Sequence, residues 1–225
     1  DPVGEEVWAR LPNTFKLAAT STIIAIVLAL PLGVIAAIKQ NTLFDGVSMF
    51  ISLLGISIPI FWFGLLLILL FSVTLGWFPV SGADQGIKSL VLPSLALGFQ
   101  HMAAIARTTR SSMLEQIRQD YIRTVRAKGL PEGEVITKHA LRNALIPTTT
   151  VIGLQMGGML GGSVLTESVF AWPGIGRYMV QSIQGRDIPS VMGCIIIFAI
   201  SFALINLLVD LIYGFIDPRI KAQYK

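Results

Sequence analysis

The residues in this chain that could do chemistry are few and lie far apart. His101 and Met102 are adjacent in an apolar run, and an imidazole beside a thioether could bind a soft metal ion as transported cargo. A lone histidine on an apolar helix more often forms a hydrogen bond to a neighbouring group, and we favour that interpretation. The second histidine, His139, lies in a separate polar segment. Cys194 is the single cysteine, so an intrachain disulfide and a cysteine metal cluster are excluded.

The sequence contains no motif for catalysis. A GxxxxGKS/T phosphate-binding loop, an HExxH zinc motif and a GxSxG nucleophile turn are all absent. The carboxylates Glu167 and Asp210 lie near the ends of apolar runs, where interfacial anchoring or an ion pair accounts for them. We therefore predict that the chain is not an enzyme and holds no cofactor. If transport is energised, the energy must enter through a partner.

The only long polar segment runs from Asp120 to Pro147 and is punctuated like two short helices. Residues 127–131 (AKGLP) place a glycine, which suits the left-handed end of a helix, just before a proline, which suits a helix start. Glu134 precedes Lys138 by four residues, the favourable order for a helical ion pair. An apolar stripe leads into the segment at helical spacing: Leu114, Ile117, Tyr121 and Val125. Two short helices with a glycine hinge predict a structured projection that docks another protein.

The rest of the chain has the composition of a membrane protein. It is 53% hydrophobic and 13% charged with a mean hydropathy of +0.72, whereas soluble domains are about 25% charged. We predict an all-α integral membrane protein, a polytopic transmembrane helix bundle that forms a single domain over 1–225. Apolar runs of sufficient length predict five spans, at 14–38, 46–77, 90–112, 148–169 and 190–216.

Prolines and polar stretches divide the remaining chain. Pro31 interrupts the first apolar run and Pro59 the second, and we interpret 46–77 as one tilted or kinked span rather than two hairpin halves. Residues 170–189 are predicted to form a loop rich in Gly and Pro. The other predicted segments are an extracytoplasmic lead-in at 1–13, a cytoplasmic coupling segment with two short helices between the third and fourth spans at 113–147, and a cytoplasmic tail at 217–225.

The distribution of Lys and Arg predicts the orientation in the membrane. Of the 17 such residues, twelve fall at Lys39, within 107–142 and in the tail after Asp217, against five elsewhere. Positive charge concentrates on the cytoplasmic side, so the central segment and the C-terminus are predicted to be cytoplasmic. Five spans then place the N-terminus outside, which is natural if one earlier span precedes this region.

Glycines at four-residue spacing mark the fourth predicted span. Gly153, Gly157 and Gly161 remove side chains from one helix face and allow close approach of a neighbour. Ordinary packing within the chain would account for them. A helix that lines a pore or a subunit interface would account for them equally, and the polar Gln155 on the same span favours a cavity-facing helix.

Several stretches resemble the permease subunits of ABC importers, in the branch for dipeptides, oligopeptides and nickel. The coupling loop of that branch is similar to residues 120–129 (DYIRTVRAKG) and 139–147 (HALRNALIP). The general family pattern is Glu-Ala-Ala, three residues and Gly. Here Gly129 stands at the glycine position, residues 123–125 (RTV) replace Glu-Ala-Ala, and the closing proline is displaced to Pro147.

Two further stretches, 54–62 (LGISIPIFW) and 170–176 (FAWPGIG), match the same branch, so the resemblance covers nearly the whole chain. It implies a multi-pass protein of a bacterial or archaeal inner (plasma) membrane, usually with six spans. The implied partners are a second homologous permease, two cytoplasmic ATPase subunits that use ATP and magnesium, an extracytoplasmic solute-binding protein and the lipid bilayer. The implied cargo is a dipeptide, an oligopeptide, glutathione or a nickel complex.

The resemblance implies that ATP-driven movement of the ATPases is passed to the two short helices as levers. The residues expected to couple to the ATPase are Arg126, Ala127, Lys128, Gly129, Leu130, Arg142, Asn143 and Pro147. Plain positive-inside charge is the alternative for the basic residues among them. A self-sufficient channel or an ion-driven secondary transporter is the alternative function, although the spans contain few of the charges it would use. A DNA-binding helix-turn-helix is disfavoured because spans flank the segment on both sides, so no nucleic-acid partner is expected.

Overall fold

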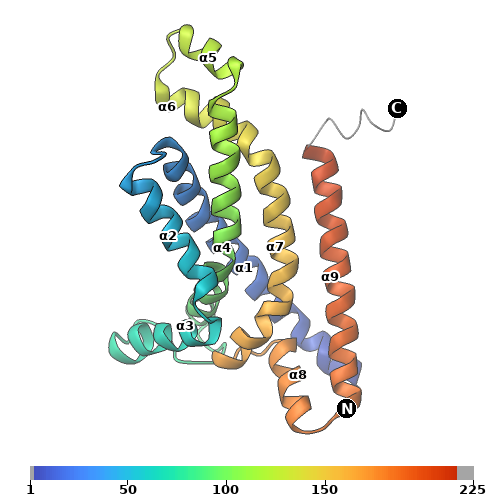
Figure 1. The fold of residues 1–225 in the computed structure, drawn as a ribbon. Helices are drawn as coiled ribbons and strands as arrows, with labels where there is room; N and C mark the ends of the chain where they lie inside the picture. The colour runs from blue at the N-terminus through green and yellow to red at the C-terminus, as the bar shows by residue number, and fades with distance from the viewer. Residues whose placement is uncertain (1–2, 217–225) are drawn as a thin grey trace, which may run out of the picture.

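The computed structural model describes residues 3–216, and over this range every regular element is a helix, which confirms the all-α prediction. Figure 1 shows long helices packed side by side, with α5 and α6 at one end and α8 at the other. In chain order the helices are α1 (Val3–Ile38), α2 (Leu43–Ser57), α3 (Ile60–Leu67), the π-helical η1 (Ile68–Thr74), α4 (Ile87–Ile117), α5 (Asp120–Ala127), α6 (Glu132–Glu134), the π-helical η2 (Val135–Ala140), α7 (Leu141–Val169), α8 (Ile175–Gln184) and α9 (Ile188–Ile216).

Helix α4 lies at the centre and packs against α1, α2 and α7. Small residues allow the α1–α4 contact to be close. A Cβ atom added to Gly98 of α4 would lie 2.7 Å from the backbone oxygen of Ser21, and one added to Gly33 of α1 would lie 2.6 Å from that of Ala106. Real side chains do not fit at such distances, so glycine is required where these two backbones meet.

Within residues 3–216, three helices are long and apolar enough to cross a membrane, namely α1, α4 and α9. The pair α2 and α3–η1 gives a fourth if it is counted as one broken span. The remaining predicted span, 148–169, lies on α7, a helix of 29 residues whose glycines and threonines lower its apolar character. The total of five spans stays a prediction.

The second predicted span, 46–77, is not one continuous helix. The chain bends by 105° between Leu43–Ser57 and Ile60–Thr74, and Figure 1 shows α3 lying across the direction of α2. Ile58 is extended, with φ −88° and ψ 124°. Pro59 favours this conformation, because its ring disfavours the α region for the preceding residue.

Two other boundaries differ from the sequence prediction. Residues 1–13 were predicted as a separate lead-in, but from Val3 onward they are the first turns of α1, and the helix continues through Pro12 and Pro31. The prolines disfavour a continuous helix, but packing against α4 stabilises it. The residues of α1 buried in a stripe include Ala18, Ala25, Ala29 and Gly33. The predicted tail 217–225 lies outside the described residues.

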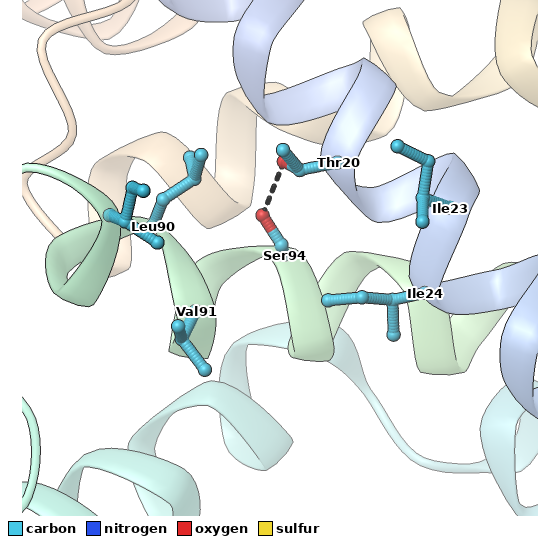
Figure 2. Close-up of a pocket in the computed structure, with 7 residues that line it drawn as sticks. Thr20, Ile23, Ile24, Leu90, Val91 and Ser94 are labelled. Atoms are coloured by element: carbon cyan, nitrogen blue, oxygen red, sulfur yellow. Dashed lines mark hydrogen bonds between the residues drawn. The ribbon is translucent and has the colours of Figure 1, made fainter.

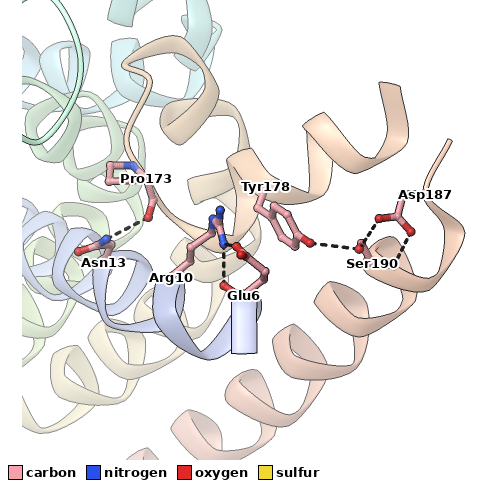
Figure 3. Close-up of polar contacts among 7 residues, drawn as sticks. All are labelled: Glu6, Arg10, Asn13, Pro173, Tyr178, Asp187 and Ser190. Atoms are coloured by element: carbon pink, nitrogen blue, oxygen red, sulfur yellow. Dashed lines mark hydrogen bonds and ion pairs between the residues drawn. The ribbon is translucent and has the colours of Figure 1, made fainter. Parts of the chain in front are cut away.

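The predicted loop 170–189 contains a helix, α8, so that prediction was wrong in part. Figure 3 shows polar contacts that tie α8 and the residue Pro173 before it to α1 and to the start of α9. Asn13 on α1 donates to the Pro173 carbonyl (3.0 Å), and the Tyr178 hydroxyl lies 3.1 Å from the Ser190 hydroxyl on α9. The guanidinium of Arg10 stacks 4.4 Å from the centre of the Tyr178 ring. These long-range contacts form only after folding, so a local pattern could not indicate them.

A small cavity of about 220 Å³ lies between α1 and α4 (Figure 2). Its lining is apolar except for Thr20 and Ser94, whose hydroxyl oxygens are 2.6 Å apart. Because the two hydroxyls satisfy each other, the cavity presents a hydrocarbon-like surface.

Candidate functional site

The predicted coupling segment begins with a break in the helix. Helix α4 ends at Ile117, and α5 starts at Asp120. Leu114, Ile117 and Val125 of the predicted apolar stripe are partly buried against one apolar cluster, as predicted, but the break changes the helical phase at Tyr121. Tyr121 is 37% exposed, and the neighbouring Ile122 is fully buried instead. Sequence spacing could not place Ile122 inside, because the stripe assumed an unbroken helix.

Ile122 anchors α5 in an apolar cluster that we call the coupling cluster. Its buried members are Ala37, Met113, Ile122, Val135, Ile136, Ala140 and Ala144. Leu130 packs against the cluster and Ala127 is exposed. The members come from α1, α4, α5, η2 and α7, so burying Ile122 fixes α5 relative to three long helices. Full burial of a large apolar side chain such as Ile122 stabilises the packing of α5 on these helices by about 1.5–3 kcal/mol.

Gly129 ends the first short helix in the left-handed conformation, with φ +81°, as its position predicts. A Cβ atom at this position would meet nothing within 4 Å, so conformation and not space requires glycine. Across the turn, Arg126 donates to both carboxylate oxygens of Glu132, at 3.0 and 2.6 Å. The same guanidinium lowers the pKa of Glu132. Arg126 was predicted to contact the ATPase; in the structure its ion pair with Glu132 stabilises the turn between the two short helices.

The second short helix is not a separate element. Residues 132–140 run directly through α6 and η2 into α7, and Pro147 lies inside α7 and not at a boundary. The proline loses only one backbone hydrogen bond, and the chain around it stays helical because Ala144 and Thr148 are buried on either side. The predicted ion pair forms, with Lys138 Nζ 2.6 Å from Glu134 Oε1. Because residues 132–140 and α7 are one continuous helical segment, a force applied to residues 132–140 would move α7 with them.

A polar network joins α5 to α7. The Asn143 amide donates to the Tyr121 hydroxyl (2.9 Å), and that hydroxyl donates to Gln116 on α4 (2.8 Å). Asn143, predicted as an ATPase contact, thus holds α5 in place. Lys128 and Arg142 are exposed and form no ion pair with any residue in 3–216, so they remain the basic candidates for an external contact.

The predicted glycine face of α7 divides between two environments. A Cβ at Gly157 would lie 3.1 Å from the Asn206 side chain of α9, and a Cβ at Gly153 would overlap the Val209 side chain. These two glycines serve helix packing within the chain. Gly161, by contrast, has nothing within 4 Å of an added Cβ and is exposed.

His101 and Met102 point in different directions. Met102 is 1% exposed within the core, whereas the His101 ring lies 3.3 Å from the Gln155 amide on α7. Within residues 3–216 no group of three or more His, Cys, Asp or Glu side chains is placed to hold a metal ion. The hydrogen-bonding interpretation of His101 is confirmed.

Residues 29–222 match the family model described as binding-protein-dependent transport system inner membrane component. The chain belongs to this family. It is therefore the membrane component of a transport system and has the role of a permease, not of an enzyme.

Relatives and solved structures agree with the family. The chain is 48% identical to the dipeptide transport system permease protein DppB of Alkalihalophilus pseudofirmus, over 98% of this chain and 74% of the relative. It is 46% identical to the glutathione transport system permease protein GsiC of Escherichia coli and 44% identical to the oligopeptide permease AppB of Bacillus subtilis, over 98% of this chain and 72% of each. A crystal structure of the methionine ABC transporter MetNI shares the fold, with a TM-score of 0.81, 21% identity, and coverage of 96% of this chain and 99% of that one.

The permease contains an ion pair that the sequence analysis did not identify. Arg110 on α4 donates from two nitrogens to both oxygens of Asp45 on α2, each at 2.7 Å, and the Asn41 backbone N–H donates to the same carboxylate at 3.0 Å. Asp45 is only 6% exposed. The partners are 65 residues apart, and only the charges themselves could have suggested the pair.

A second unpredicted cluster surrounds Glu167, at the opposite end of the permease. Its fully buried carboxylate accepts hydrogen bonds from the Thr14 hydroxyl (2.8 Å) and from the backbone N–H of Arg177 (3.0 Å). Thr14 in turn accepts from the Ile175 N–H (2.9 Å). Glu167 therefore joins α1, α7 and the start of α8 through hydrogen bonds, a role that the sequence did not predict. The side chain of Asp210 lies outside the described residues.

Proposed function

We propose that this permease imports peptides. The observation that supports this cargo is its 44–48% identity, over 98% of its length, to permeases named for dipeptides, di/tripeptides, oligopeptides and glutathione, the last itself a tripeptide. The same observation favours peptides over nickel complexes.

The proposed energy source is ATP hydrolysis, with magnesium, in two separate ATPase subunits on the cytoplasmic side. The end of the bundle that holds α5 and α6 (Figure 1) carries Lys128 and Arg142 exposed for an external partner. The excess of Lys and Arg in 107–142 supports a cytoplasmic position for this end. A second permease subunit and an extracytoplasmic solute-binding protein complete the proposed importer.

Force would travel from the ATPase to the pore through packed elements. Movement of α5 is passed to α7 by the buried Ile122 and by the hydrogen bond between Tyr121 and Asn143. The continuous helix from Glu132 to Val169 carries it across the membrane. Alternating access then follows from movement of α7 against α4 and α9.

The test is reconstitution in liposomes. The complete importer is expected to take up radiolabelled trialanine only when ATP and loaded binding protein are present. The permease purified alone is expected to take up none. Uptake by the permease alone, driven by an ion gradient, would instead establish the channel or secondary-transporter alternative.

A further inference from the structure

The exposed face of α4 differs from the exposed faces of the other long helices. α1, α2 and α9 expose large apolar side chains along their length, as lipid-facing helices do; examples are Val27 (62% exposed), Phe50 (60%) and Leu204 (60%). In α4, all of whose residues are described, Ile87 at the first position is the only exposed large apolar side chain. The exposed face of α4 is therefore not suited to lipid.

Polar and small side chains replace the apolar ones there. We call them the α4 polar stripe, and its members, exposed or partly buried, are Gln100, His101, Ala104, Arg107, Thr108, Ser111 and Glu115. They recur every three or four residues, so they share one side of the helix. Polar and charged side chains within a membrane helix face other protein groups or water, because hydrocarbon cannot solvate them.

Helix α7 forms the other side of the same face. The Gln155 amide on α7 is 3.3 Å from the His101 ring, which joins the two helices within the stripe. Gly158 and Gly161 are exposed on α7, so no side chain projects from it at these positions. At the end of the stripe nearest α5, a cavity of about 630 Å³ is lined by Glu115, Gln116, Gln119, Tyr121, Asn143, Ile146 and Pro147.

We propose that the α4 polar stripe lines the water-filled translocation pathway and that Arg107 binds the carboxylate end of the peptide in transit. This rests on the proposed function, because the cargo is taken to be a peptide. Arg107 is exposed and forms no hydrogen bond or ion pair with any residue in 3–216. Its guanidinium fork matches a carboxylate.

Charge along the stripe fits the same cargo. Glu115 follows Arg107 by eight residues, which is about 12 Å along a helix. A peptide with free ends carries a negative carboxylate and a positive amine, so each end meets an opposite charge along this path. The cavity beside Glu115 then provides room at the cytoplasmic exit.

Cysteine accessibility in the complete importer tests the lining. In a Cys194→Ser background, Ala104→Cys and Ser111→Cys are expected to react with a membrane-impermeant maleimide added to both sides of the membrane. The matched controls Val27→Cys and Leu204→Cys, on apolar exposed faces, are expected to remain unreactive. Failure of both stripe positions to react would show that lipid or a dry contact with the second permease covers the face, and would overturn the proposal.

Arg107 is tested by its conservative and neutral variants in the reconstituted importer. With Arg107→Gln, trialanine imported per ATP hydrolysed is expected to fall about tenfold or more, because a hydrogen bond to a charged group is lost. Arg107→Lys keeps the positive charge but not the two-pronged guanidinium, so it is expected to lose less import per ATP than Arg107→Gln and to stay below the wild type. Wild-type import by the Gln variant, or equal loss of ATPase activity and import in both variants, would refute the carboxylate site. Absence of trialanine import by the wild-type importer would instead refute the proposed function.

Discussion

Gly129 shows how much one residue determines within the coupling segment. Its φ of +81° lies in the left-handed region, and an added Cβ would have free space around it. A substitution at Gly129 therefore costs free energy because of backbone strain and not because of a steric clash with a neighbouring residue. For a β-branched residue the strain is about 1–3 kcal/mol, enough to change the angle between α5 and the helix that follows.

We predict that Gly129→Val uncouples ATP hydrolysis from transport while leaving membrane insertion intact. The measurement is trialanine imported per ATP hydrolysed by the reconstituted importer. Gly133→Val is the control, because Gly133 is also exposed, has nothing within 4 Å of an added Cβ and does not have a positive φ. Normal import by the Gly129 variant would exclude its role as a hinge.

At the scale of elements, apolar packing and hydrogen bonds together hold α5 against η2 and α7. Ile122 is buried in the coupling cluster, and Asn143 donates to the Tyr121 hydroxyl at 2.9 Å. The second short helix has no boundary of its own, because residues 132–169 form one continuous helical path. The second half of the coupling segment is thus a rigid extension of α7 and not a second short helix.

Removing the hydrogen bond between Tyr121 and Asn143 is expected to weaken the attachment of α5 to α7. We predict that Tyr121→Phe and Asn143→Ala each lower the number of peptides imported per ATP, and that the double variant is no worse than the more severe single one, because both remove the same hydrogen bond. Thr137→Ala, at an exposed hydroxyl that bonds only the Gly133 carbonyl, provides the control. Additive losses in the double variant would show that the two residues act separately.

At the scale of the whole molecule, the ion pair between Asp45 and Arg110 joins α2 to the central helix. The carboxylate is 6% exposed and accepts two bonds from Arg110 and one from the Asn41 backbone. Loss of one partner leaves a charge in a poorly solvated position, which costs more than the loss of an exposed pair.

We predict that Asp45→Ala lowers the free energy of unfolding by about 2 kcal/mol, the scale of hydrogen bonds to a charged group. Arg110→Ala is expected to have a similar effect, and a double-mutant cycle monitored by thermal unfolding of the purified importer should show strong coupling. Asp120→Ala, which breaks an exposed pair with Arg123, is the matched control and is expected to change stability little. An equal effect of the two aspartate variants would contradict the assignment.

Sequence alone determined the features that depend on local chemistry. Composition and the lengths of apolar runs determined an all-helical membrane bundle, because a bilayer accepts little else. The turn at Gly129 and the ion pair between Glu134 and Lys138 follow from neighbours along the chain, and both are present. The family was also evident from contiguous motifs.

Only the tertiary structure decided which side each helix presents. Burial of Ile122 instead of Tyr121, the continuity of α7 through Pro147 and the polar exposed face of α4 all depend on packing between distant segments. Helical periodicity identifies faces but not their neighbours. Burial is a property of two elements in contact, so a pattern read along one element cannot assign it.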